Sequence, residues 1–376
     1  MGFCVKQEEV ESRMRLIIRI FLTITAISML GGCGFKDIDK RFFVVALGID
    51  LSDNEKKPYR LTLQLAVPSP KIEPGASKVQ IETIDTASVA EGVRMLKAYV
   101  DKELDFGHCK VFLIGEKLAR QDYQNLLQWM SRRRDIQSVA DIAIGKPDAE
   151  TLLQVKPVSE RYPGNTLFLS FGADGTESSY TYVESVSDFA RRASELGFDP
   201  LMPVIQKDSK ESYIINRTAL LNKKRVKLVL SPSESQLYNQ LAKDFTKSSM
   251  HGMFEGMDLV VAITELHSKF QIGKVDGEDT VTMHVKMSVV FEEAPRGLYE
   301  TNWASIERDL NREYAKTCVA LLKKIQKAKV DPIGFGLRYR ATHPGNGAWK
   351  QWQSIYPVIK FKVLADIKIE GTGLIK

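Results

Sequence analysis

The chain has 376 residues, of which 44% are hydrophobic and 27% are charged, and its formal net charge is +6. This balance is typical of a globular protein and excludes a disordered chain, while the length favours two or three domains over a single core. The 53 basic residues are interleaved with 47 acidic ones, which argues against the continuous basic stripe of a nucleic-acid-binding protein.

An export signal is predicted at the amino terminus. Residues 20–30 form the apolar run IFLTITAISML, which follows Arg13, Arg15 and Arg19. A basic segment, a short apolar segment and small residues before a boundary are typical of a secretory signal peptide. The run is shorter than the ~20 apolar residues that a membrane-spanning helix needs. We therefore predict a signal peptide over residues 1–32.

The sequence LGGC that ends at Cys33 resembles the lipobox of bacterial lipoproteins. The resemblance implies cleavage before Cys33, a diacylglyceryl group on its thiol, and a lipidated tether over residues 33–41. A plain signal peptide with an incidental cysteine is the alternative. Residues 1–13 hold three glutamates, which suit no export signal, so we expect translation to start at Met14.

Residues 42–205 are predicted to form an amino-terminal α+β region. Strands are expected over residues 42–50, 60–67, 78–84, 111–115 and 139–144, and helices over 87–102, 118–132 and 183–196, from apolar spacings of two and of three to four residues. Residues 155–182 are rich in Pro, Gly, Ser and Thr, so the region can divide into two subdomains near residues 146–160.

The basic cluster of Arg132, Arg133 and Arg134 ends the helix expected over residues 118–132. A solvated helix end is the simplest interpretation. A contact with an acidic partner or with anionic head groups is the alternative.

The main boundary is expected between Pro203 and Ser212, followed by a carboxy-terminal α+β domain over residues 210–376. Strands are predicted over residues 214–221, 226–230, 259–265, 270–274, 280–292 and 359–369, and a long helix over 303–329. Ser231 and Glu234 are spaced as a capping box at the start of another helix. Because one-sided apolar strands need a cover, we predict an antiparallel sheet with the long helix packed on one face.

No motif for catalysis, cofactor binding or metal binding is found in the sequence. The five histidines form no HExxH pair, and GxSxG and phosphate-binding loops are absent. Cys109 and Cys318 lie in apolar patterns and are predicted to be buried thiols, with a disulfide between them as an open alternative. We therefore expect a protein that binds partners, not an enzyme.

Three segments together resemble one family, the Ger(x)C spore-germination lipoproteins. They are VALGID (45–50) with TLQLAVPSP (62–70), LDFGHCKVFLIGEKLA (104–119) continuing to RRRD (132–135), and VDPIGFGLRYRATHPGNGAWKQWQSIYP (330–357) with VLADIKIEGTGLIK (363–376). The resemblance implies a three-domain α+β lipoprotein on the outer face of the spore inner membrane. It also implies membrane-spanning A and B subunits as partners in a nutrient germinant receptor, and a lipid on Cys33.

The motif residues have structural interpretations as well. Gly107 and His108 are predicted to make a tight turn before a strand, with a partner contact as the alternative. The residues Gly334, Phe335 and Gly336 are predicted to shape a turn after the long helix. Nearby tryptophans are expected in the core, although tryptophan also anchors interfaces; these are Trp349 and Trp352.

Two other functions stay open at this point. A lipid-anchored solute-binding protein of a transporter should show two α/β lobes with parallel sheets, and the antiparallel alternation near the carboxy terminus argues against it. An envelope lipoprotein hydrolase would need a nucleophile, a base and an orienting group in one cleft.

Overall fold

The computed structural model describes residues 13–25, 40–66, 79–156, 163–171, 178–208, 212–244, 247–299, 301–345 and 347–372. Cys33 and the expected cleavage site therefore lie outside the described residues. Residues 13–25 form a largely exposed helix, and no described helix is both long enough and apolar enough to cross a membrane. The compact unit Phe42–Lys376 contains the two sheets.

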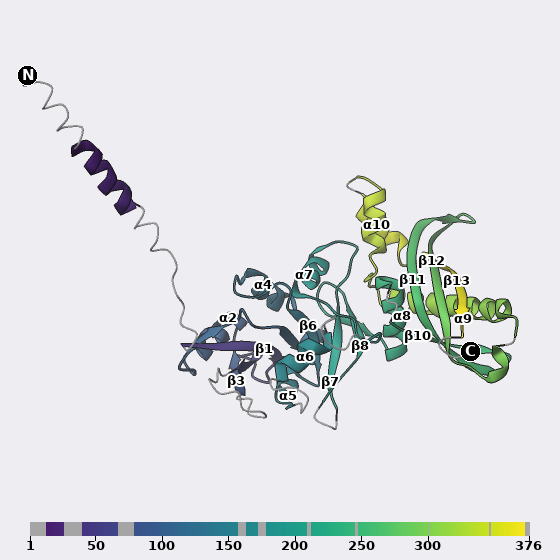
Figure 1. The fold of residues 1–376 in the computed structure, drawn as a ribbon, viewed down its shortest axis with the longest axis horizontal. Helices are drawn as coiled ribbons and strands as arrows, with labels where there is room; N and C mark the ends of the chain where they lie inside the picture. Colours follow the sequence, from purple (N-terminus) through teal and green to yellow (C-terminus); the bar gives the residue numbers. More distant parts are fainter. Residues whose placement is uncertain are drawn as a thin grey trace, which may run out of the picture. The chain divides into compact units, whose positions relative to one another are not determined.

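A mixed sheet occupies the first half of this unit (Figure 1). Its strand order is β3-β2-β1-β5-β6-β7-β8-β9, and β4 also pairs with β1. The strands are β1 (Arg41–Leu51), β2 (Tyr59–Ala66), β3 (Val79–Thr86), β4 (Glu103–Asp105), β5 (Val111–Gly115), β6 (Asp141–Lys146), β7 (Leu201–Lys207), β8 (Tyr213–Leu221) and β9 (Val226–Val229). The central strands β1, β5, β6 and β7 are parallel, and the outer pairs are antiparallel.

Helices cover both faces of the first sheet, which explains why all five residues of β5 are buried. One face packs against α2 (Val89–Leu96), α3 (Glu116–Gln121), α4 (Gln124–Arg132) and α7 (Val186–Ser194). The other face packs against α5 (Ala149–Leu153) and α6 (Pro163–Phe171). The single helix predicted over residues 118–132 is thus two helices. Tyr123 interrupts it because its N–H and hydroxyl donate to the carbonyls of Lys224 and Asn222, at 3.1 and 2.7 Å.

Strands β8 and β9, which the sequence pattern assigned to the carboxy-terminal domain, belong to the first sheet instead. The sheet therefore continues across the predicted boundary between Pro203 and Ser212. The alternation in β8 explains this placement, because its two faces enter different cores. Leu221 packs in the core of the first sheet, and Leu220 packs in the core of the second. A local sequence pattern predicts that a segment forms a strand, but it does not predict with which other strand that segment pairs.

A second sheet fills the other half, with the order β10-β11-β12-β13. Its strands are β10 (Ser249–Phe254), β11 (Met257–Val275), β12 (Glu278–Glu293) and β13 (Lys360–Gly371), and its helices are α8 (Pro232–Lys243), α9 (Trp303–Lys327), α10 (Phe335–Thr342) and α11 (Ala348–Ile355). The short segment η2 (Arg296–Leu298) precedes α9. The strands predicted over 259–265 and 270–274 are one continuous strand, β11. The capping box of Ser231 and Glu234 is present at α8.

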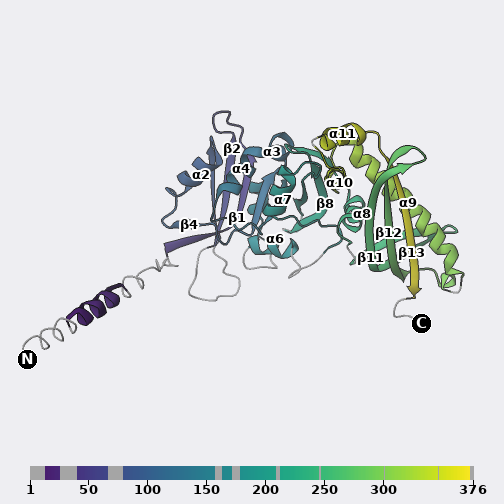
Figure 2. The ribbon, with the colours of Figure 1, turned by 90° about the horizontal axis from the view of Figure 1, so that it is seen from above.

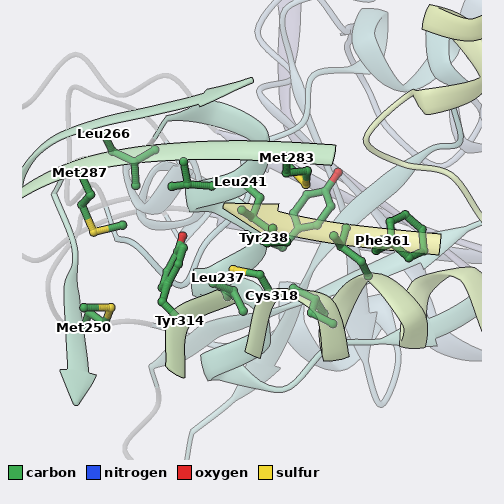
Figure 3. Packing of buried hydrophobic residues seen from close by; sticks show 14 of the residues in the cluster. Leu237, Tyr238, Leu241, Met250, Leu266, Met283, Met287, Tyr314, Cys318 and Phe361 are labelled. Atoms are coloured by element: carbon green, nitrogen blue, oxygen red, sulfur yellow. The ribbon is translucent and has the colours of Figure 1, made fainter. Parts of the chain in front are cut away.

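The long helix α9 packs its apolar stripe on one face of the second sheet, as the sequence predicts (Figure 3). The buried residues of the stripe are Ile306, Leu310, Tyr314, Cys318, Leu321, Leu322 and Ile325. The opposing strand β12 buries alternate residues: Val281, Met283, Val285, Met287, Val289 and Phe291. The α+β class with one long helix on the carboxy-terminal sheet is therefore confirmed.

The second sheet is mixed, and not purely antiparallel as predicted, because β13 runs parallel to β12. The helices α9, α10 and α11 lie between these strands in the chain and return it to the end of the sheet from which β12 starts. Such a crossover allows parallel pairing, whereas a short hairpin forces antiparallel pairing. The alternation of apolar and polar residues along a strand does not show whether the strand pairs in a parallel or an antiparallel direction.

Helix α9 also protects the outer edge of β13, beside which it lies in Figure 2. The N–H of Ile367 donates to Asn311 Oδ1 at 2.8 Å, and the N–H of Ile369 donates to Glu307 Oε1 at 2.9 Å. Side chains of the helix thus occupy edge amides that would otherwise be open to pairing with another strand.

Deletion of residues 358–369 is expected to unfold the carboxy-terminal half. The deletion removes Phe361, Val363 and Ile367, which are buried, and each such side chain contributes about 1.5–3 kcal/mol. Urea unfolding followed by circular dichroism measures the effect. The control is Val358→Ala, because Val358 is 76% exposed, and it should leave stability unchanged. Cooperative unfolding of the truncated protein at unchanged stability would refute the sheet assignment.

Candidate functional site

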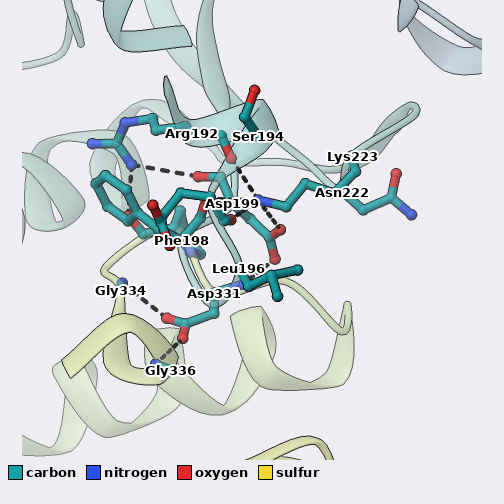
Figure 4. Close-up of polar contacts among 12 residues, drawn as sticks. Arg192, Ser194, Leu196, Phe198, Asp199, Asn222, Lys223, Asp331, Gly334 and Gly336 are labelled. Atoms are coloured by element: carbon teal, nitrogen blue, oxygen red, sulfur yellow. Dashed lines mark hydrogen bonds and ion pairs between the residues drawn. The ribbon is translucent and has the colours of Figure 1, made fainter. Parts of the chain in front are cut away.

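A buried carboxylate lies in the loop between α9 and α10. Asp331 is 4% exposed, and its two oxygens accept the backbone N–H groups of Gly334, Phe335 and Gly336 at 2.9, 3.0 and 2.6 Å (Figure 4). Gly334 has a φ of +90°, a conformation that glycine adopts without steric cost. The side chain of Asp331 therefore satisfies the otherwise unpaired amides at the start of α10.

The same loop is bonded to a second loop, which joins α7 to β7. The N–H of Asp331 donates to Asp199 Oδ2 at 2.8 Å, and the N–H of Asp199 donates to the Asp331 carbonyl at 2.9 Å. Lys223 Nζ lies 3.3 Å from Asp199 Oδ1 and donates to the carbonyls of Glu195 and Phe198 at 2.6 and 2.8 Å. We call these two loops, residues 195–200 and 330–337, the joint.

Two glycines bring the backbones of the joint into direct contact. The N–H of Leu337 donates to the Gly197 carbonyl at 2.9 Å. A Cβ on Gly197, whose φ is +79°, would lie 2.5 Å from the carbonyl carbon of Gly336. A Cβ on Gly336 would lie 2.4 Å from Nε1 of Trp352. Any side chain at either position would force the two loops apart.

Arg192, in α7, hydrogen-bonds to the second loop of the joint. It is 6% exposed, and its guanidinium donates to the Pro332 carbonyl at 2.9 Å and to the Tyr182 hydroxyl at 2.8 Å. Nε lies 3.0 Å from Glu184 Oε1 in an ion pair, and the guanidinium stacks 3.9 Å above the ring of Phe198. The buried charge is thus paired and hydrogen-bonded, which offsets the cost of removing it from water.

Burial raises the pKa of Asp331 to about 7, although its three backbone N–H bonds act in the opposite direction. Burial likewise raises the pKa of Glu184 to about 7, against the influence of Arg192. The carboxyl groups of the joint are already engaged by backbone amides or by the guanidinium. Within the described residues, no group of three or more His, Cys, Asp or Glu is placed to hold a metal ion. The arrangement fixes loops relative to each other and offers no exposed reactive group.

The motif residues predicted from the sequence fall in two places. Gly334 and Gly336 belong to the joint. Phe335 also lies in the joint, but its side chain enters the second core, where its ring meets Phe270 edge-on with the ring centres 4.8 Å apart. Trp352 is buried against Gly336, and Trp349 is half-buried at the margin of the same core. Whether any of these residues meets a partner stays a prediction.

Gly107 and His108 lie elsewhere, at the amino end of β5. The Gly107 N–H donates to Asp105 Oδ1 at 2.8 Å, and Gln137 Nε2 donates to the Gly107 carbonyl at 2.6 Å. The exposed ring of His108 packs edge-on against Phe43 at 4.6 Å. The turn is thus held by Asp105 and Gln137.

Sequence reasoning missed the charged residues of the joint, since Asp199, Lys223 and Arg192 stand in no motif. Asp331 stands in the motif VDPIGFG but was not singled out. Asp50, in VALGID, has a similar role: its oxygens accept the N–H groups of Ala149 and Glu150 at 2.8 and 2.9 Å. Burial raises the pKa of Asp50 to about 6. A single acidic residue within an apolar motif is the sequence signal that could have identified both Asp331 and Asp50.

The two described cysteines are buried free thiols, so the alternative of a disulfide is wrong. Cys109 lies in the core of the first sheet and Cys318 in the core of the second. Burial raises the pKa of Cys318 to about 12 and that of Cys109 further. Neither thiol is therefore reactive at neutral pH.

Comparison with known families gives two adjoining matches. Residues 34–207 match the family model described as the spore germination protein N-terminal domain. Residues 216–373 match the model described as spore germination B3/GerAC like, C-terminal. Together the two matches cover most of the chain.

Individual relatives agree with these matches. The chain is 24% identical to spore germination protein KC of Bacillus subtilis, over 96% of this chain and 97% of that protein. It is 22% identical to the putative spore germination protein YfkR of the same organism, over 96% and 98%. It is 21% identical to spore germination protein GerQC of Bacillus cereus, over 72% and 76%. The crystal structure of the GerBC protein shares the fold, with a TM-score of 0.56 and 16% identity over 86% of this chain and 97% of that one.

Gly197→Ala is expected to destabilise the protein more than a matched change at Gly277. Both glycines have a φ near +80°, but a Cβ on Gly277 meets nothing within 4 Å. Gly277→Ala should therefore cost only backbone strain, about 1–2 kcal/mol. Gly197→Ala should add about 1–3 kcal/mol for the collision with Gly336. Equal losses in urea unfolding would show that the two loops can separate freely.

Asp331→Asn is expected to destabilise the protein more at about pH 5 than at about pH 8. A carboxyl whose pKa is raised to about 7 in the folded state, from about 3.9 unfolded, binds more protons when folded between these values. Its contribution to stability therefore falls as the pH rises through this window, and asparagine lacks that dependence. Unfolding free energies at the two pH values measure the difference, which a pH-independent loss would contradict.

Proposed function

Because the chain belongs to the spore germination B3/GerAC-like family, we propose that it is a lipid-anchored subunit of a nutrient germinant receptor. In this proposal acyl chains on Cys33 hold it on the outer face of the spore inner membrane. It acts through contacts with membrane-spanning A and B subunits and contributes to the triggering of germination. The family is one of germination proteins and is not a known enzyme family.

The observation that carries the proposal is the place where the family match begins. The match to the amino-terminal domain starts at residue 34, directly after Cys33. The residues before it carry the basic and apolar segments of an export signal. A leader that is removed before Cys33 would leave a mature chain that consists of the family's two domains and a lipid at its first residue.

Anchoring by lipid suits a receptor subunit in which no helix of the described residues is long and apolar enough to cross a membrane. Each buried CH₂ group contributes about 0.8 kcal/mol, so two or more acyl chains hold a folded domain firmly at a bilayer. The protein then meets membrane-spanning partners in two dimensions, at a high effective concentration. The joint supports this role, because it ties the two sheets together through bonds between residues far apart in the chain.

The second sheet argues against a solute-binding protein of a transporter. Such a protein should have two α/β lobes with parallel sheets, whereas β10, β11 and β12 form an antiparallel meander. The helix α9 covers one face of this sheet. No feature of the described residues favours that function over a receptor subunit.

Cys33→Ala tests the lipid anchor. The variant is expected to accumulate as an unprocessed precursor and to lose labelling by a radioactive fatty acid, because the thiol that receives the diacylglyceryl group is gone. Cys318→Ala, which removes a buried thiol far from the leader, is the matched control and should be processed and labelled normally. Continued labelling of the Cys33 variant, or a mature protein whose amino terminus is not Cys33, would overturn the proposal.

Co-purification tests the partners. The protein is expected to be recovered from spore membranes together with membrane-spanning proteins, which mass spectrometry identifies. Recovery without any membrane-spanning protein would contradict a role in a receptor complex.

A further inference from the structure

Several motif segments meet at one edge of the first sheet. Strands β1, β5 and β6 are parallel, so their amino ends share an edge. The turn at Gly107 and His108 lies there, and Gln137 bonds it to the loop that precedes β6. Lys102 Nζ lies 5.4 Å above the ring of Phe42, at the start of β1. We call this surface the amino edge; it comprises residues 42–43, 97–103, 107–108 and 132–139.

The arginine cluster is held at this edge by aromatic rings. The guanidinium of Arg133 lies 4.6 Å from the centre of the Phe106 ring and 5.4 Å from that of Trp129, and it forms an ion pair with Asp135. This stacking fixes the segment that follows α4. Arg132 and Arg134, on either side of the anchored Arg133, are exposed.

The amino edge is basic. Its acidic residues are Asp101, Glu103 and Asp135, and its basic residues are Lys97, Lys102, Arg132, Arg133 and Arg134. Asp105, just beside it, is held in the Gly107 turn. The amino edge therefore carries five basic residues against three acidic ones.

Large apolar side chains are exposed beside these charges. Val139 is 71% exposed and Tyr99 is 63% exposed. Tyrosine is enriched where a protein meets the head-group region of a bilayer, because its ring is apolar and its hydroxyl is polar. A basic surface with exposed tyrosine and valine is suited to an anionic bilayer surface better than to water alone.

The length of the chain before this edge places it close to the membrane. Phe42 is separated from Cys33 by eight residues, and an extended chain spans at most about 3.3–3.6 Å per residue. Phe42, at the start of the amino edge, therefore stays within about 30 Å of Cys33. This distance limit from the membrane rests on the proposed attachment of a lipid to Cys33.

We propose that the amino edge binds anionic phospholipid head groups, so that the tethered domain docks on the bilayer through this surface. Lys97, Arg132 and Arg134 supply charge, and Tyr99 and Val139 enter the interface. A basic residue near an anionic surface strengthens binding by roughly fivefold. The lipid limits how far the domain can move away, and the amino edge determines which side faces the membrane.

The test uses the mature, lipid-modified protein in vesicles, with Val139→Cys carrying an environment-sensitive dye. Cys109 and Cys318 are buried and should not react. The dye emission is expected to rise in vesicles of phosphatidylcholine with phosphatidylglycerol but not in phosphatidylcholine alone. The rise should disappear in about 1 M salt, where the Debye length is about 3 Å.

The variant R132Q/R134Q should lower the ratio of docked to undocked protein about 25-fold, from roughly fivefold for each charge. The matched control R308Q/K316Q removes the same charge from the exposed face of α9 and should have no effect. Equal emission in both vesicle types, or an equal loss in the control, would overturn the proposal. Failure of the protein to sediment with any vesicle would instead show that the lipid anchor is absent, which separates the two hypotheses.

Discussion

The bonds of Asp331 are the interactions on which the arrangement of the two halves depends. Its side chain, a buried polar group that is costly to leave unpaired, accepts three backbone amides of its own loop and so fixes the conformation of that loop. Its backbone N–H and carbonyl bond to Asp199, and these two bonds form only when the loops of residues 195–200 and 330–337 touch. Gly197 and Gly336 permit that contact because neither has a side chain.

The first sheet uses the same physical solution at Asp50. Its carboxylate accepts the amides of Ala149 and Glu150 at the start of α5, and a Cβ on Gly115 would collide with it at 1.9 Å. In both places a buried acid satisfies unpaired amides at a helix start. This requirement explains why a single acid stands within each of these apolar segments.

The joint and the amino edge have complementary roles in the proposed function. In the function proposed here, the amino edge orients the first sheet on the membrane, and the joint carries that orientation to the second sheet. The surface around α9 would then lie at a defined distance from the bilayer, where membrane-spanning partners can contact it. Binding partners in this way requires a body whose halves keep their relative position, which the bonds of Asp331 and Arg192 provide.

The sequence by itself determined the elements that follow from local periodicity and the family to which the chain belongs. The stripe of α9, the alternation of β12 and the capping box at Ser231 depend on neighbouring residues only. The tertiary structure decided which strands pair and in which direction: β8 joins the first sheet, and β13 runs parallel to β12. It also decided the joint, since Asp199 and Asp331 are 132 residues apart. No local pattern records such a contact, because burial and pairing of charges depend on how distant segments pack.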